Sequence, residues 1–480
     1  MKKLLTLFCI YPALIFAQDP HVTKLDLFLK SAEKYNNFNG NVLIAKGGKM
    51  IYEKSIGYSN FSTKEKLSPN SMFELASLTK PFVATAIFQL KEKGKLSLSD
   101  TLRKFIPELP YKNVTIYQML SHTSGLPDEY EAMDKKWDRK KFAYNKDVIE
   151  FLAAENLPPD FAPGSKCEYS NVAYELLAVI VERVSGQSFA SYVQENICKP
   201  IGLKNTRVYN TRRTKGEKIP GYAYGYVKDS TRGYIIPDSL IKYSWVIYPD
   251  GIYGAGNISS TAEDLYLFDR ALKDNKFFTN IIQDELQQSR ALWDTTYKIY
   301  YSLSSQKVGM NEFGRYIHSG VAGWPGYKND MIRYLRDDLV IIVLSNNESN
   351  AGYISGALAY IMNDQPVVNA YEHKEYPMES RQLSRFEGAY TVPYIPDAIT
   401  INIFKKDKKL YYQPVQLMDR AVKSEPIELT PESPNKFFLS KGEDIQIEFD
   451  LKKSGKVDKA YFILYNMKKE MVPYRRPAGK

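Results

Sequence analysis

The spacing of apolar residues changes near Pro366, and this change constrains the fold more than any other feature of the sequence. From about Val22 to Asp364, short apolar runs alternate with amphipathic helical patterns. Beyond Pro366, apolar residues recur at every second position in short segments separated by turn-like spacers. A chain of 480 residues is also too long for one compact domain. We therefore predict a mixed α/β (α+β) domain followed by a smaller antiparallel β domain.

In the N-terminal part, two periodicities predict different elements. Apolar residues three and four apart favour helices, whereas short continuous apolar runs between turn signals favour buried strands. Gly94 and Gly186 follow two of the helical patterns and are suitable helix ends. The predicted strands are Asn41–Ala45, Met50–Glu53 and Leu339–Leu344, and the predicted helices are Phe82–Leu90, Val172–Val184 and Ile354–Met362.

The C-terminal part differs in composition as well as in period. Polar residues around Pro377 predict a linker at residues 367–380, between a domain at 18–366 and a β domain at 381–480. We find no helical pattern in the β domain, and period-2 segments at this spacing predict an antiparallel, barrel-like arrangement. Its clearest predicted strands are Ile399–Ile403, Lys409–Gln413, Ile445–Phe449 and Ala460–Leu464.

Residues Met1–Ala17 combine a short basic start, an apolar core and a small final residue. This pattern is typical of a secretory signal peptide and predicts cleavage after Ala17, with export to the periplasm or the medium. The alternative is a retained N-terminal anchor. No later apolar stretch is long enough for a membrane span, so none is expected after cleavage. Cleavage removes Cys9 and leaves Cys167 and Cys198, whose pairing in a disulfide the sequence leaves open.

Ser77 and Lys80 have the spacing S-x-x-K at the start of a predicted helix. Residues three apart share one helix face, so the amine of Lys80 would lie beside the hydroxyl of Ser77. A serine hydroxyl becomes a good nucleophile when a neighbouring base removes its proton, and a lysine amine can be that base. The alternative is that Ser77 is an ordinary helix cap. Pro81 also disfavours helical geometry at Lys80.

A second polar group opens the helix predicted at Val172–Val184. Tyr169 and Asn171 lie two residues apart on the loop that leads into it. A phenol can accept or relay a proton, and an amide can orient a lysine or a substrate amide. The alternative is that Asn171 or Ser170 is only the helix cap and that Tyr169 belongs to the core.

Two further segments contain a histidine among small residues. His318-Ser319-Gly320 is followed by Gly323 and Gly326, and glycines near a strand allow another backbone to approach closely. A substrate could then hydrogen-bond along the strand's edge. His122, in the sequence LSHTSGLP, invites a Ser-His-Asp interpretation. We favour a structural role, in which this histidine and its neighbouring hydroxyls stabilise a buried turn.

Taken together, these segments occur in an order that resembles the serine β-lactamase and penicillin-binding superfamily. The class C branch, with its DD-peptidases and esterase-like hydrolases, is the most similar. The resemblance extends from about Phe38 to Asn347, and it implies an antiparallel sheet flanked by helices together with an all-helical subdomain. The segments are S-x-x-K from Ser77, LSHTSGLP from Leu120, PG at Pro163, YSN from Tyr169, GAGNISSTAEDL from Gly254 and HSG from His318.

The resemblance also implies roles for individual residues. Ser77 would be the acylated nucleophile, Lys80 and Tyr169 would share the proton transfers, and Asn171 would complete the polar cluster. The backbone N–H groups of Ser77 and Val321 would form the oxyanion hole. Losing one such donor typically costs a hundredfold or more in rate.

The segment His318-Ser319-Gly320 stands where the family often has K-T-G, and it would contact the substrate. A lysine there is a permanent cation, whereas a histidine is only partly charged at neutral pH. H-x-G variants are more similar to DD-peptidases, D-amino-acid peptidases and esterases than to dedicated β-lactamases. We therefore expect poor hydrolysis of β-lactams.

The remaining signals are negative. The sequence has no H-E-x-x-H and no Cys/His cluster, so we expect neither a metal nor a cofactor. The net charge of +10 is mild for this length, and the basic runs are short, so nucleic-acid binding is not expected. We predict an exported serine hydrolase that acts on a small-molecule or peptide substrate with an amide or ester bond, with peptidoglycan as a possible partner. The alternatives are a class C-type β-lactamase and a non-catalytic protein that binds penicillin or peptidoglycan.

Overall fold

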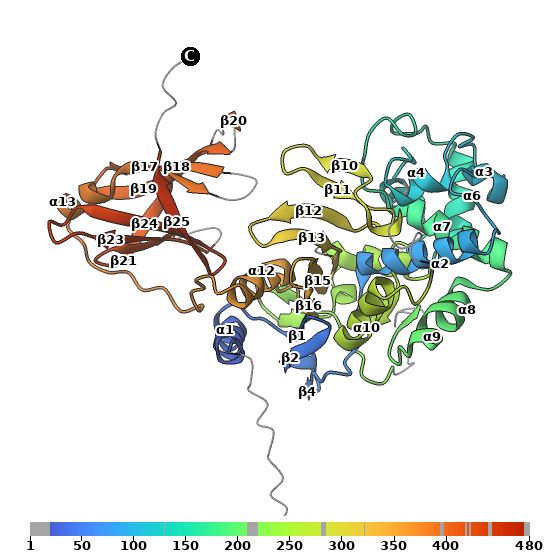
Figure 1. Cartoon of the computed structure of the whole chain (residues 1–480), viewed down its shortest axis with the longest axis horizontal. Coiled ribbons are helices and arrows are strands. Elements are labelled where there is room, and N and C mark those ends of the chain that lie inside the picture. Colours follow the sequence, from blue (N-terminus) through green and yellow to red (C-terminus); the bar gives the residue numbers. More distant parts are fainter. Residues whose placement is uncertain are drawn as a thin grey trace, which may run out of the picture.

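The computed structural model describes residues 20–128, 130–208, 219–279, 285–320, 322–393, 398–417, 420–421, 424–439 and 444–474. Figure 1 shows a larger N-terminal domain, built on one sheet with helices on both sides, and a C-terminal β-barrel. The signal peptide proposed at Met1–Ala17 lies outside the described residues. Within the described ranges, no helix is both long and apolar enough to cross a membrane.

An antiparallel sheet forms the centre of the N-terminal domain. The short strand β14 pairs with β15 and lies outside the continuous strand order of this sheet. β16 is buried over its full length because it lies between β15 and β1. All three strands predicted in this domain are confirmed, since β1 pairs with both β2 and β16. In spatial order the strands are β10 (Ala291–Asp294), β11 (Ile299–Tyr301), β12 (Lys307–Asn311), β13 (Gly314–His318), β15 (Tyr327–Tyr334), β16 (Leu339–Ser345), β1 (Gly40–Lys46) and β2 (Lys49–Ile56), with β14 at Ala322–Trp324.

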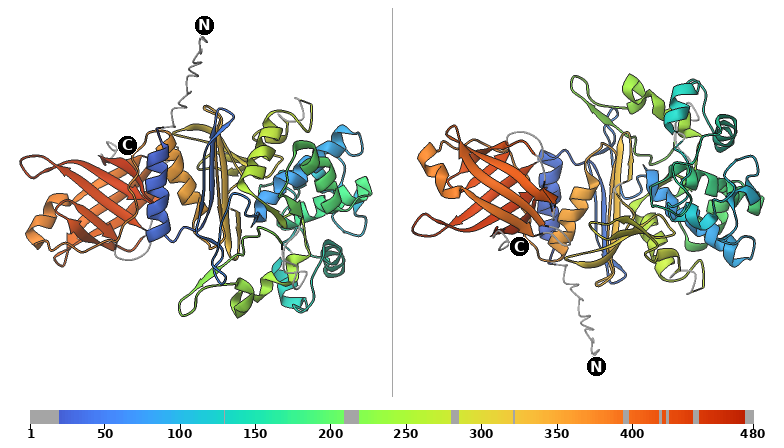
Figure 2. Two further views of the ribbon diagram at one scale, coloured as in Figure 1. Left: turned by 90° about the horizontal axis from the view of Figure 1, so that it is seen from below. Right: turned by 90° about the horizontal axis from the view of Figure 1, so that it is seen from above.

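The two faces of the sheet pack against different helices, as Figure 2 shows with the sheet seen edge-on. Ile341 and Val343 point to the face covered by α1 (Val22–Tyr35) and α12 (Ala351–Met362). Ile342 and Leu344 belong instead to the apolar core that includes α2 (Lys80–Glu92) and α10 (Ala262–Lys273). Successive side chains of a strand point to opposite faces, so the continuous apolar run of β16 serves both cores.

Shorter helices form a subdomain beyond α2, which packs against α7. The predicted helices lie within α2, α7 and α12, and the N–H of Gly186 ends α7 by donating to the carbonyl of Glu182. The helices are α3 (Leu102–Phe105), α4 (Ile116–Leu120), α5 (Tyr130–Lys136), α6 (Asn145–Glu155), α7 (Asn171–Ser185), α8 (Phe189–Val193) and α9 (Lys199–Ile201). The short strands are β3 (Tyr58–Asn60), β4 (Glu65–Lys66), β5 (Phe73–Glu74), β6 (Arg207–Val208), β7 (Val227–Asp229), β8 (Gly233–Ile235) and β9 (Ile258–Ser260).

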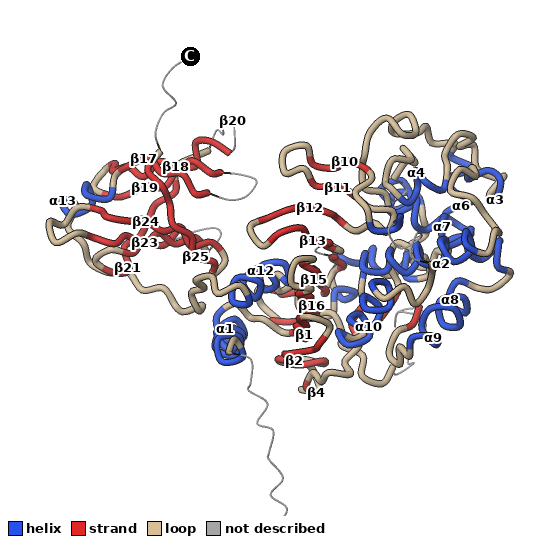
Figure 3. Tube along the Cα trace, viewed as in Figure 1, coloured by secondary structure: helices blue, strands red, loops and turns tan. Residues whose placement is uncertain are grey.

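The C-terminal strands close into an antiparallel barrel, because β18 pairs with β17 on one side and with β19 on the other. Figure 3 shows these strands in red. The barrel and the helix-flanked sheet confirm the expected fold class. The strands are β17 (Gly388–Pro393), β18 (Ala398–Lys406), β19 (Lys409–Leu417), β20 (Arg420–Ala421), β21 (Ile427–Ser433), β22 (Lys436–Leu439), β23 (Ile445–Leu451), β24 (Val457–Leu464) and β25 (Met467–Pro473).

One expectation for this domain was wrong, because a short helical segment precedes the first strand. It consists of α13 (Ser380–Leu383) and a 3-10 turn at Ser384–Phe386. Glu379 and Gln382 form a reciprocal capping box at its start, and Phe386 is buried in the barrel core at its end. Two helical turns are too short to produce a visible period in the sequence.

The barrel contacts the N-terminal domain at α12. The ring of Tyr465, in the turn between β24 and β25, stacks on Tyr353. Lys469 pairs with Glu312 at 3.0 Å. The open question of the disulfide is also answered, because Cys167 and Cys198 are both free.

Candidate active site

Ser77 lies in a one-turn 3-10 helix at Ala76–Thr79, directly before α2. The 3-10 turn and the first turn of α2 together bring Lys80 Nζ to 3.2 Å from Ser77 Oγ. Lys80 keeps helical geometry (φ −58°, ψ −38°) despite Pro81. A proline is tolerated there because it occupies the first turn of α2, where its missing N–H would have no intrahelical acceptor.

The backbone just before Ser77 is strained. Ala76 has φ +48°, in the left-handed region that residues with a Cβ rarely adopt. Such strain persists only where the surroundings hold the backbone in place, and it is often found next to reacting groups. Here Leu75, directly before the turn, and Leu78, within it, are both buried and hold the turn against the core.

Lys80 is completely buried, yet three oxygen atoms lie within hydrogen-bond distance of its side-chain nitrogen. In addition to Ser77 Oγ, Nζ donates to Asn171 Oδ1 at 2.9 Å and to the carbonyl of Ala255 at 3.0 Å. Among the described residues, no carboxylate forms an ion pair with it. The amine is therefore fixed by neutral groups and aimed at the serine.

Tyr169 approaches Ser77 from the other side. Its phenol oxygen lies 2.6 Å from Ser77 Oγ, and Lys80 Nζ lies 4.7 Å from the centre of its ring. Ser170 is the cap of α7, since its hydroxyl accepts from the N–H of Ala173. Asn171, the first residue of α7, is therefore free to face Lys80. The structure thus brings Ser77, Lys80, Tyr169 and Asn171 into one hydrogen-bonded group.

His122 contacts the ring of Tyr169 and the backbone of Ser170, but it forms no hydrogen bond to Ser77 or Lys80. Its Nδ1 accepts from the N–H of Ser170 at 3.1 Å, so Nε2 carries the proton and donates to Ser305 Oγ at 2.7 Å. Burial, and to a smaller degree the charge of Lys80, hold the pKa of His122 well below its usual range. A neutral imidazole in van der Waals contact with the Tyr169 ring agrees with the structural role inferred from the sequence.

The side chains of the segment His318-Ser319-Gly320 bind other parts of the protein and are not part of the group around Ser77. His318 Nε2 lies 2.6 Å from Asp330 Oδ1, and Ser319 Oγ accepts from Gln306 Nε2 at 3.0 Å. Neither they nor Gly320 lines the cavity described next, whereas Gly323 and Trp324 do. Val321, expected to donate one oxyanion-hole N–H, lies outside the described residues.

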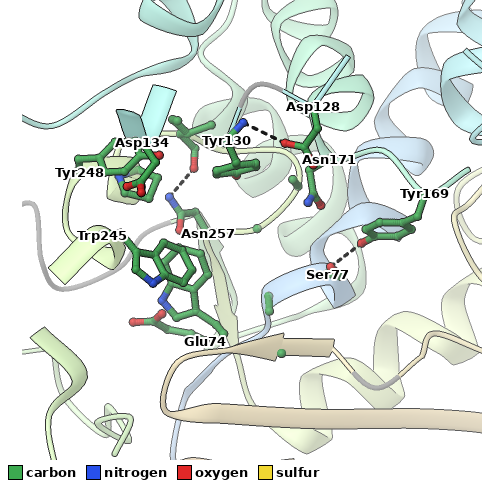
Figure 4. Close-up of a pocket in the computed structure, with 17 residues that line it drawn as sticks. Glu74, Ser77, Asp128, Tyr130, Asp134, Tyr169, Asn171, Trp245, Tyr248 and Asn257 are labelled. Atoms are coloured by element: carbon green, nitrogen blue, oxygen red, sulfur yellow. Dashed lines mark hydrogen bonds between the residues drawn. The ribbon is translucent and has the colours of Figure 1, made fainter. Parts of the chain in front are cut away.

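A cavity of about 540 Å³ opens over the serine. Figure 4 shows Ser77 and Tyr169 at one end of it and Trp245 and Tyr248 towards the other. Most of its walls could not be predicted from the sequence, because they come from four segments far apart in the chain that share no recognisable pattern. The lining residues with acidic or aromatic side chains that the sequence pattern does not single out are Glu74, Asp128, Tyr130, Asp134, Trp245, Tyr248 and Trp324.

The geometry favours acyl transfer to serine. A hydroxyl with an amine and a phenol in contact, at the edge of a cavity, can attack a bound carbonyl and pass its proton on. Within the described residues, no three His, Cys, Asp or Glu side chains are placed to hold a metal ion.

Comparison with known proteins agrees with this chemistry. The family model described as beta-lactamase matches residues 27–363. Penicillin-binding protein 4* of Bacillus subtilis (strain 168) is 37% identical over 451 residues, which is 92% of this chain and 95% of the relative. Among solved structures, a penicillin-binding protein of Bacillus halodurans is 25% identical and covers 70% of this chain and 98% of its own, with a TM-score of 0.61.

Two more distant structures share the fold. The octameric penicillin-binding protein homologue of Pyrococcus abyssi covers 94% of this chain and 99% of its own, at 22% identity and a TM-score of 0.62. The D-amino acid amidase of Ochrobactrum anthropi covers 72% and 98%, at 18% identity and a TM-score of 0.60. The family implies serine hydrolase or acyltransferase activity in general. The resemblance seen in the sequence is confirmed: the chain belongs to the serine β-lactamase and penicillin-binding protein superfamily.

Proposed function

We propose that this protein is an exported serine hydrolase that cleaves amide or ester bonds through an acyl-enzyme on Ser77. The observation that carries the proposal is the position of Ser77 Oγ, 3.2 Å from Lys80 Nζ and 2.6 Å from the Tyr169 phenol. Export is proposed from the signal-like pattern of Met1–Ala17.

In the proposed reaction, Ser77 Oγ forms a bond to the substrate carbonyl carbon, and the bond from that carbon to the leaving nitrogen or oxygen breaks. The proton of Ser77 passes to the pair formed by Lys80 and Tyr169, and from the pair to the leaving group. The pair can accept this proton in either of two forms that have the same total charge. If Lys80 is a neutral amine and Tyr169 a phenol, the amine accepts the proton. If Lys80 is an ammonium and Tyr169 a phenolate, the phenolate accepts it. Water then attacks the acyl-enzyme, which releases a carboxylic acid and restores Ser77.

Asn171 and the carbonyl of Ala255 position the lysine for these transfers. His122 positions Tyr169 through the N–H of Ser170 and through ring contact. We include D-amino-acid peptides, peptidoglycan-type peptides and esters among the candidate substrates. The D-amino acid amidase fold supports the first of these.

A fluorophosphonate probe tests the proposal directly. We expect a mass increase of one probe adduct on the intact protein, and its loss in Ser77→Ala. The matched control is Ser165→Ala, which removes an exposed hydroxyl in the nearby loop and should be labelled normally. A folded wild-type protein that takes up no adduct, or an adduct that persists in Ser77→Ala, would contradict the proposal.

A further inference from the structure

The cavity above Ser77 is lined by three carboxylates. They belong to Glu74, Asp128 and Asp134, and none of the other described lining residues is a lysine, arginine or histidine. Lys80 lies beneath the serine, completely buried, and does not line the cavity. A concave, partly dehydrated site with one sign of charge attracts ligands of the opposite sign and repels those of the same sign.

The three carboxylates differ in what already binds them. Glu74 is almost completely buried and accepts a hydrogen bond from Tyr222 in the protein core. Asp128 is exposed, and the one hydrogen bond that its carboxylate accepts from the described part of the chain comes from the N–H of Tyr130 to Oδ1, at 2.9 Å. A carboxylate has about four acceptor positions, so Asp128 keeps capacity for a ligand.

Asp134, on α5, has one oxygen bound and one without a partner. Its side chain is 37% exposed, and its Oδ2 pairs with Arg139 at 2.6 Å, whereas Oδ1 is itself shielded from water and accepts no hydrogen bond from the residues that the structure describes. A buried carboxylate oxygen without a donor is costly, and a donor on a bound ligand would remove that cost. Trp324 Nε1, in the same cavity, is likewise buried and has no acceptor among the residues described.

Aromatic rings make up much of the remaining wall. Tyr130 lies next to Asp128, and Trp245 packs edge to face against Trp324 with ring centres 5.3 Å apart. Tyr248 is a further aromatic lining residue. Ring faces attract cations, and they also bury apolar groups. Carboxylates interspersed with aromatic rings form a suitable site for an organic ammonium group.

We propose that this cavity selects acyl donors that carry a protonated amine close to an apolar or aromatic group, with Asp128 and Asp134 as the residues that bind the ammonium. The substrate class is therefore aminoacyl amides or esters. Substrates whose non-reacting part carries a carboxylate, which include β-lactams and peptides with a free C-terminus, bind less well. The inference rests on the proposed reaction at Ser77 and adds the specificity of that site.

The test measures how well small amides protect Ser77 from the fluorophosphonate probe, so it requires no turnover. Each pair differs only by an amine: D-phenylalaninamide against 3-phenylpropanamide, and Nα-acetyl-D-lysinamide against Nα-acetyl-D-norleucinamide. At pH 6.5, where these amines are mostly protonated, we expect the amine to protect at a concentration at least tenfold lower in one or both pairs. Equal protection in both pairs overturns the inference. Absence of labelling at Ser77 would instead contradict the proposed reaction.

Variants identify the residues responsible. In Asp128→Asn and in Asp134→Asn, the preference for the amine should fall about tenfold, the effect of losing one charged hydrogen bond. The matched control is Asp138→Asn, an exposed carboxylate just beyond α5 that does not line the cavity, and it should keep the full preference. A preference unchanged in both cavity variants overturns the assignment. Asp128 is exposed, so its variant tests the inference even if Asp134→Asn fails to fold.

Discussion

His318 lies 2.6 Å from the buried carboxylate of Asp330, on the sheet face that α12 covers. The second oxygen of Asp330 accepts a hydrogen bond from Ser355 of α12. Neighbouring Met331 and Arg333 point to the opposite face, where Arg333 pairs with Asp269 of α10. The histidine of the HSG segment therefore links the strand to α12, and through α12 to the region where the barrel docks.

This link predicts a loss of stability in Asp330→Asn. The amide keeps the size of the side chain, but one of its two polar atoms then presents hydrogens to His318 or to Ser355. We expect the free energy of unfolding to fall by about 1–3 kcal/mol, as for other buried donors that lose an acceptor. Urea unfolding measures the change. The control is Asp337→Asn, an ion-paired residue at the protein surface, which should change stability by less than about 0.5 kcal/mol.

Tyr169→Phe should reduce catalysis without loosening the fold. The variant removes the phenol oxygen 2.6 Å from Ser77 and keeps the ring that contacts His122 and Tyr301. We expect kcat for a p-nitrophenyl ester to fall by about a hundredfold or more, the usual contribution of proton transfer. Thermal unfolding should be unchanged within a few degrees.

Tyr301→Phe is the matched control for that variant. Tyr301 is a buried tyrosine with its ring centre 6.1 Å from that of Tyr169, and it forms no hydrogen bond to Ser77. It should keep kcat within about threefold of the wild type, because it removes a hydroxyl that the proposed proton transfers do not use. Equal losses in both variants would show that packing around Tyr169, and not its phenol, matters.

Much of the site could be predicted because it depends on local spacing. The spacing S-x-x-K places Lys80 beside Ser77 through one turn of backbone. Ser170 and Asn171 are consecutive at the start of α7, so their side chains point in different directions: Ser170 caps the helix and Asn171 contacts Lys80. Helices such as α7 were visible for the same reason, because their period, cap and final glycine lie within one short segment.

What could not be predicted depends on contacts between distant segments. The direction of His318 is set by the pairing of β13 with β15, in which His318 lies opposite Ile332, and a shift of one residue would turn it to the other face. Asp128, Asp134 and Trp245 follow no periodic pattern, and they line one cavity only because the subdomain folds over the sheet. The spacing of residues within one segment does not predict contacts between segments that are far apart in the sequence.

Gly254→Ala tests the carbonyl that holds Lys80. Gly254 has φ +109°, and a Cβ there would lie 2.4 Å from the carbonyl oxygen of Tyr174, which is backbone and cannot move aside cheaply. The next residue, Ala255, supplies the carbonyl that accepts from Lys80. We expect a loss of about 3 kcal/mol or more in stability, and a fall in kcat in whatever protein remains folded.

Gly233→Ala separates that steric effect from the effect of backbone conformation. Gly233 also has positive φ (+76°), but a Cβ there would meet nothing within 4 Å. This variant should cost only about 1–2 kcal/mol, the usual cost of a left-handed conformation for alanine, and should leave kcat unchanged. Similar losses of stability in Gly254→Ala and Gly233→Ala would mean that the left-handed backbone conformation alone, without the steric clash, explains the result.

His373 should make the contact between its own segment, which precedes α13, and the barrel dependent on pH. Its ring lies 2.6 Å from Glu432 and 3.2 Å from Asp444, and hydrogen bonds to Asp444 and Glu432 raise the pKa of His373 to about 9. A pKa raised above its value in the unfolded chain, about 6.5, stabilises the fold fully below pH 6.5, and this contribution is lost as the pH rises through 9. We expect at most about 3 kcal/mol of stability to be lost between pH 6 and pH 10.

The measurement is urea unfolding followed by circular dichroism across that range, in the wild type and in His373→Gln. Lysines, tyrosines and thiols also titrate near pH 10, so the quantity to compare is the difference between the two proteins. Lys436 donates to the Tyr371 hydroxyl, and that hydroxyl donates to Glu432, the partner of His373. These groups are present in both proteins, so their own titration cancels in the comparison. The difference should be largest at pH 6 and should shrink as the pH passes 9, because the imidazolium that holds both carboxylates is present only below that pH. A difference that stays constant from pH 6 to pH 10 would show that His373 acts through the packing of its ring on Phe438 instead.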